Sequence, residues 1–133
     1  MIALDTNILL RSVLDDDAKL SPVARRLLER NLCHVSLLAI GEMGFVLMSV
    51  YGVKPPAVAQ ACRTLLALPN VECENEERLL QAMAGVEKGV DWFDALLWAA
   101  TPDGMALATF DKPFAKRAAA LGWSVEVRVP KAR

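Results

Sequence analysis

Apolar and polar residues occur along the chain in blocks that predict short strands followed by helices. The first block, IALDTN at residues 2 to 7, passes from apolar residues to three polar ones within a few positions. Short apolar runs bounded by turn signals are typical of buried strands. The pattern therefore predicts a strand over residues 1 to 5, and it raises the question of why Asp5, Thr6 and Asn7 follow so early.

Blocks of the same kind predict the remaining elements. Further strands are expected over residues 33–38, 71–74, 105–110 and 124–129, and helices over 7–14, 22–31, 39–51, 55–68, 75–89, 91–100 and 112–122. Ser21 before Pro22 is a helix start signal, with the serine as cap and the proline in the first helical position. Asn75 is expected to cap its helix, and Gly52 to end one in a left-handed conformation.

The alternation of strands and helices predicts the fold class. It favours an α/β protein with a central, mostly parallel, twisted sheet of four to five strands and helices on both faces. Without repeats or linkers, residues 1–133 are interpreted as a single domain. In such sheets ligands bind beyond the carboxyl ends of the strands, so the strand ends are where functional residues are sought.

Composition and charge narrow the classes of function only slightly. Hydrophobic residues make up 54% of the chain and charged residues 23%, which suits a globular protein. The net charge of -1 gives no sign of nucleic-acid binding, so such a partner would need local basic patches or a metal. Three cysteines without metal-site spacing, and a start unlike a secretion signal, favour the cytoplasm. The apolar run over residues 35–53 contains Glu42 and is interpreted as a strand and buried helix, with no membrane association.

Four acids are the candidate functional residues. Asp5 and Asp111 follow predicted strands, Asp94 lies in the first turn of a helix, and Glu42 lies in an apolar helix. Helix capping is an alternative for Asp5, for Asp111 and also for Asp91, because an aspartate before a helix accepts hydrogen bonds from free backbone N–H groups. Thr6 and Asn7 are open to a similar interpretation as turn residues.

Glu42 is harder to explain as a local feature. No other acidic or basic residue except His34 lies between Arg30 and Lys54. A buried carboxylate without a partner is costly, so Glu42 must be exposed, paired or coordinating. Its apolar flanks favour the last two, and His34 is interpreted as an ordinary half-buried histidine.

Acids gathered in one crevice would repel each other unless a cation neutralised them. Oxygen ligands alone favour a hard ion such as Mg²⁺ or Mn²⁺ over zinc. An ion of this kind on carboxylates typically serves phosphate chemistry.

The quoted residues resemble a known family over essentially the whole chain. LDTN at the start, GEMGFVL around Glu42, DWFDALLWAA around Asp94 and LATFDKPF around Asp111 are similar, in order and spacing, to PIN-domain ribonucleases. The resemblance is to the VapC-type toxins of toxin-antitoxin pairs in particular. It implies a PIN-like fold and an acidic site of Asp5, Glu42, Asp94 and Asp111 that binds one or two Mg²⁺ or Mn²⁺ ions and hydrolyses RNA.

The resemblance also implies supporting residues and partners. Asn7 and Thr109, and more weakly Thr6, match polar positions that orient an acid or a bound water, while Asp91 stays outside the main site. Lys112, Lys116 and Arg117 could contact the RNA backbone or form a solvated helix face. VapC-type proteins are homodimers held inactive by a small antitoxin that crosses the acidic crevice.

Two other functions are compatible with parts of this pattern. A PIN-like module could bind RNA or a protein without cleaving, although all four acids are present. A phosphoacceptor signalling domain also places acids at strand ends, but it carries a paired acid near the first strand and a lysine at the end of a late strand. Here the late strand ends in Thr109, Phe110 and Asp111, so this alternative fits poorly.

Overall fold

The computed structural model describes residues 1–132, and it contains the predicted strands and helices in the predicted order. The strands are β1 (Ile2–Ala3), β2 (Cys33–Val35), β3 (Val71–Cys73), β4 (Leu107–Ala108) and β5 (Val127–Arg128). The helices are α1 (Thr6–Val13), α2 (Leu20–Arg30), α3 (Leu37–Ser49), α4 (Pro55–Leu66), α5 (Glu76–Glu87), α6 (Trp92–Ala99) and α7 (Lys112–Ala120). Each strand is shorter than predicted, and α1 begins one residue and α3 two residues sooner than predicted.

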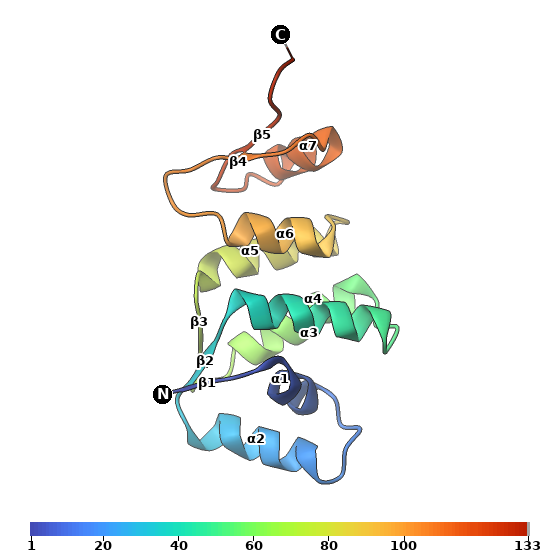
Figure 1. The fold of residues 1–133 in the computed structure, drawn as a ribbon, viewed down its shortest axis with the longest axis vertical. Helices are drawn as coiled ribbons and strands as arrows, with labels where there is room; N and C mark the ends of the chain where they lie inside the picture. The colour runs from blue at the N-terminus through green and yellow to red at the C-terminus, as the bar shows by residue number, and fades with distance from the viewer. Residues whose placement is uncertain (133) are drawn as a thin grey trace.

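The strands are all parallel, but among residues 1–132 they form two sheets instead of one. The first sheet has the order β1-β2-β3, and the second pairs β4 with β5. Figure 1 shows α1 and α2 at one end of the molecule and β4, β5 and α7 at the other, with α5 and α6 between them and the first sheet. The predicted sheet of four to five strands is therefore divided in two. At the point of division, β1 pairs only with β2, and β4 pairs only with β5.

The first sheet is covered fully on only one face. Cys33, Val35 and Val71 are buried in the core. On the opposite face, Ala3 and Glu72 are exposed and His34 is half-buried, with its Nδ1 2.9 Å from Glu72 Oε1. Helices were predicted on both faces of the sheet. The outer face is instead open to solvent at these positions, where His34 and Glu72 pair with each other.

The predicted helix caps have mixed outcomes. The Ser21 cap is wrong: α2 begins at Leu20, Asp17 Oδ1 accepts hydrogen bonds from the N–H groups of Lys19 and Leu20, and the buried Ser21 hydroxyl donates to Leu14 O. Asn75 stands at the cap position of α5, but its side chain donates to Ala99 O and makes no cap bond. Gly52 has a φ of 65°, as predicted.

Two tryptophans hold α6 to the elements on either side of it. Trp98 is fully buried, its indole N–H donates to Val125 O at 2.9 Å, and its ring stacks on Trp123 with centroids 4.1 Å apart. Trp92 donates its indole N–H to Gly41 O at 3.1 Å. The first contact joins α6 to the segment that follows α7, and the second joins α6 to α3.

The approach of Trp92 to α3 requires glycine at position 44. A Cβ built on Gly44 would lie 2.1 Å from Cζ2 of Trp92, whereas a Cβ on Gly41 would meet nothing within 4 Å. The apolar stretch that contains α3 is thus shaped by packing against α6. In the described part of the chain, no helix is long and apolar enough to cross a membrane.

We predict that Gly44→Ala destabilises the protein and that Gly41→Ala does not. The added methyl at position 44 must displace a buried indole, which costs about 1 to 3 kcal/mol in the free energy of unfolding. Alanine at position 41 has free space and a better helix propensity, so stability should stay equal or rise by up to about 1 kcal/mol. Urea unfolding of both variants measures this, and equal midpoints would contradict the close contact.

Candidate active site

The position of Asp5 explains why polar residues follow the first strand so early. It is the N-cap of α1, and its carboxylate accepts a hydrogen bond from Ile8 N at 3.0 Å. The exposed Asn7 lies in the first turn of the same helix, and the Thr6 hydroxyl donates to Glu42 Oε2 at 3.3 Å. The strand ends at Asp5 because a helix begins there, and this helix start is tied to Glu42 on α3.

Glu42 is exposed, in contrast to the burial that its apolar neighbours favoured. It projects from a helix whose next residue, Met43, is fully buried. Its side chain lines a cavity of about 600 Å³ between α3 and α6, together with Asp94. Of the three states predicted for this carboxylate, the structure therefore shows exposure with one hydroxyl partner.

Asp94 lies where two cavities meet. It lines the cavity that contains Glu42 and also a smaller one, of about 180 Å³, with Asp91 and Asp111. Burial raises the pKa of the Asp94 carboxyl above its ordinary value, and the charges of Asp91 and Asp111 raise it further. Like charges and partial desolvation both disfavour the ionised form, as expected for a crowded acidic site.

Asp111 and Asp91 are held in place by the helices that they cap. Asp111 accepts a hydrogen bond from Phe114 N at 2.9 Å, and its own N–H donates to Thr109 Oγ1 at 3.0 Å. Asp91 accepts from the N–H groups of Phe93 and Asp94, at 3.1 and 3.2 Å. The capping interpretation is therefore confirmed for Asp91, Asp111 and Asp5, and capping holds Asp91 and Asp111 in the lining of the smaller cavity.

Three of the four predicted acids line shared cavities: Glu42 shares one with Asp94, and Asp94 shares another with Asp111. Asp5 lines neither of these cavities, and its neighbour Thr6 provides the link to Glu42. Over residues 1–132, no three or more His, Cys, Asp or Glu side chains form a group that could hold a metal ion. The donors are all oxygens, which suits Mg²⁺ or Mn²⁺, and the crowding at Asp94 is the kind that a cation relieves.

Two features beside the acids were not predicted. Phe93, just before Asp94, is 52% exposed and lines the cavity with Glu42, while Arg117 lines the smaller cavity with Asp94. The sequence offered Arg117 as a contact to the RNA backbone or as part of a solvated helix face, and its position beside Asp94 was not predicted. Phe93 stands next to a candidate acid in the sequence, but the pattern does not indicate that its ring would be exposed.

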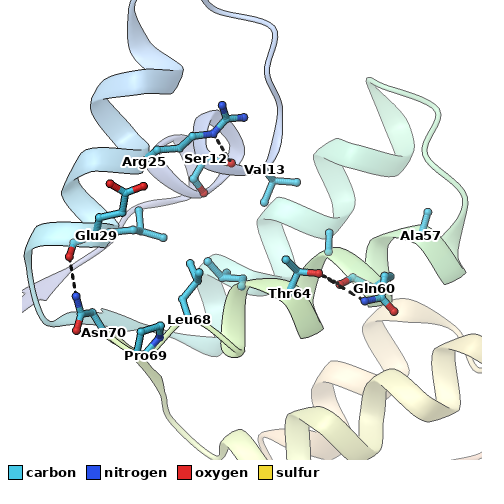
Figure 2. A pocket seen from close by; sticks show the side chains of 13 residues that line it. Ser12, Val13, Arg25, Glu29, Ala57, Gln60, Thr64, Leu68, Pro69 and Asn70 are labelled. Atoms are coloured by element: carbon cyan, nitrogen blue, oxygen red, sulfur yellow. Dashed lines mark hydrogen bonds between the residues drawn. The ribbon is translucent and has the colours of Figure 1, made fainter.

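A further cavity, of about 640 Å³, lies away from all four acids. Figure 2 shows it between α1, α2 and α4, with Arg25 and Ser12 at one side and Gln60 and Thr64 at another. Arg25 donates to Ser12 O, and Asn70 donates to Glu29 O at 2.7 Å. Its lining is mostly apolar and contains none of the four candidate acids, so this cavity is separate from the candidate site.

The comparison with known families agrees with the resemblance of the motifs. The model of the PIN domain family matches residues 2–120, a span that includes Asp5, Glu42, Asp94 and Asp111. The comparisons with curated proteins and with solved structures found no match. PIN domains are in general nucleases. On the strength of a match over most of its length, the chain belongs to the PIN domain family.

Proposed function

We propose that this protein is a Mg²⁺- or Mn²⁺-dependent endoribonuclease whose acids are Asp5, Glu42, Asp94 and Asp111. The observation that carries the proposal is the position of Asp94, which lies beside Glu42 on one side and Asp111 on the other. A carboxyl in a cleft whose pKa is raised by burial and by neighbouring carboxylates, as at Asp94, is typical of sites built for a cation or for proton transfer. Membership of a nuclease family supports the same activity.

The roles of the residues follow from their contacts. Asp94, Asp111 and Glu42 would hold the divalent ion, and Asp5, at the start of the helix that Thr6 ties to Glu42, would be a further ligand. When bound, such an ion activates water and neutralises charge on the phosphate under attack. The Thr6 hydroxyl orients Glu42, and Thr109 fixes the backbone of Asp111. Arg117, beside the smaller cavity, is placed to bind a phosphate of the RNA.

A PIN module that binds RNA or a protein without cleaving is the second candidate. One observation favours it: three of the site's aspartates cap helices, and no group of metal-binding side chains was found in residues 1–132. Such a module would bind its partner even in the presence of a chelator, and it would not cleave RNA when a metal ion is added. A cleavage assay with and without metal therefore separates the two candidates.

We predict that the protein cleaves labelled RNA with Mg²⁺ or Mn²⁺ and loses this activity in EDTA. Asp94→Asn and Asp5→Asn should each lower the rate about 100-fold or more, because charge stabilisation at the reacting phosphate is lost. Asparagine caps helices about as well as aspartate, so Asp5→Asn should keep its fold. Asp94 is not a helix cap, and asparagine is nearly the same size, so Asp94→Asn should keep its fold as well. Gel analysis of the RNA measures the rate.

Asp15→Asn is the matched control. Asp15 is an exposed aspartate whose carboxylate is 3.3 Å from Arg25, remote from the cavities around Asp94. Its replacement should leave cleavage unchanged. RNA that stays intact with either metal, or full activity in Asp94→Asn, would contradict the nuclease proposal.

We further propose that the protein is the toxin of a type II toxin-antitoxin pair, a homodimer inhibited by a small antitoxin. The VapC-like motifs support this role. Exposed apolar side chains support a partner surface: Val23 on α2 is 50% exposed and Leu32 58%. We expect the isolated chain to sediment as a dimer at micromolar concentration and to arrest growth unless the antitoxin is co-expressed. A monomer, or growth unaffected by an active chain, would contradict this proposal.

A further inference from the structure

The cavity between α3 and α6 combines acids with exposed apolar side chains. Its lining includes the carboxylates of Glu42, Glu74 and Asp94 together with Phe93, Leu38 and Leu97. Leu38 is 74% exposed and Leu97 57%, although both belong to helices that are otherwise well packed. Apolar surface beside carboxylates indicates a ligand that is partly flat or apolar and partly polar.

Two phenylalanines lie next to the acids of this groove: Phe93 belongs to its lining, and Phe45 lies outside the lining but packs against Phe93. Phe45 follows Glu42 by three residues on α3, one helical turn along the same face. Phe93 directly precedes Asp94 on α6, and the two rings have centroids 5.9 Å apart with planes tilted by 46°. Both side chains are about half exposed, at 51% and 52%. The pair therefore offers accessible ring surface beside the proposed site of cleavage.

The two cavities that share Asp94 are both acidic but differ in their other residues. The smaller one has Arg117 beside Asp91 and Asp111, whereas the larger one has Glu42, Glu74 and Asn75 among mostly apolar side chains and, within residues 1–132, no basic residue. A nucleotide has the same two parts, an anionic phosphate and a flat base. With its phosphate beside Asp94 and Arg117, the base next to it would enter the larger cavity.

We propose that the groove between α3 and α6 is a nucleobase-binding subsite in which Phe93, supported by Phe45, stacks on a base adjacent to the cleaved phosphodiester. The inference rests on the proposed nuclease function and adds a positioning surface to it. Aromatic rings that stack on bases are the usual means of holding unpaired nucleic acid without strict sequence readout. Since a base in a duplex is already stacked and paired, the subsite requires the nucleotide at the cut to be unpaired.

The test compares two probes that differ only in their bases. One is a fluorescein-labelled RNA of eight nucleotides with mixed sequence, and the other is an abasic strand of the same length and charge. Anisotropy is measured in Ca²⁺, which takes oxygen ligands, and a gel confirms that the probe stays intact. The protein should bind the RNA about tenfold or more tightly than the abasic strand.

The variants assign this difference to the ring. Phe93→Ala should bind the RNA about as weakly as the abasic strand, Phe93→Trp should keep the preference, and Phe93→Leu should lose most of it while keeping apolar area. Val50→Ala, an exposed apolar residue at the end of α3, should behave as the unaltered protein. Thermal unfolding checks that each variant is folded. If Phe93→Ala does not fold, the comparison is made with Phe93→Leu.

The outcomes distinguish the subsite from the nuclease activity. A base preference that depends on Phe93, in a chain that cuts no RNA with Mg²⁺ or Mn²⁺, supports the subsite and overturns the activity. Cleavage with a base preference that survives in Phe93→Ala overturns the subsite alone. Absence of binding to either strand also overturns it. If Phe93→Ala turns a dimer into a monomer and leaves the base preference unchanged, the groove is a subunit interface and the subsite is overturned.

Discussion

The candidate site depends on the contact between Trp92 and α3. The indole lies against Gly44 and donates its N–H to Gly41 O, which brings α3 and α6 together at the two glycines. Glu42 lies between those glycines, and Asp94 follows Trp92 by two residues. The buried packing of one side chain thus sets the distance between two acids on separate helices. This is why a core residue without polar chemistry at the site decides its geometry.

Acidic side chains of like charge lie close together around Asp94. Asp94 is partly buried and faces Asp91 and Asp111, so its carboxyl has a raised pKa. A structure does not gather like charges without a cost in stability, and the cost is offset when a cation or a charged ligand binds. Helix capping contributes to the same arrangement, because Asp5, Asp91 and Asp111 are stabilised where they stand by backbone N–H groups. Capping and a functional role are therefore compatible for these residues.

Much of the secondary structure could be predicted from the sequence, since apolar periodicity and strong helix signals reflect local physics. The second strand was predicted too long because its apolar run, residues 33–38, continues into α3 at Leu37. Pro22 suggested a cap at Ser21, but Asp17 reaches the free N–H groups first and Ser21 is buried instead. The division into two sheets depends on long-range pairing, which no local pattern encodes.

Only part of the candidate site could be predicted from the sequence. Acids after strands and in an apolar helix could be found as residue types in a pattern. The exposure of Glu42, Phe93 and Phe45 could not be predicted, because it depends on which face of α3 packs on α6. The larger cavity gains its mixed character from this packing, with carboxylates and rings along the same groove.

The central claim is that the carboxylates around Asp94 form the binding site for a divalent cation. The most direct measurement is a titration of the isotopically labelled protein with Mn²⁺, followed by the paramagnetic broadening of backbone amide signals. The account predicts the strongest broadening at residues 91–95 and 111–114 and at Glu42, with little effect on Gln60 and Thr64 in the remote cavity. Broadening centred on that remote cavity, or none at millimolar Mn²⁺, would contradict the account.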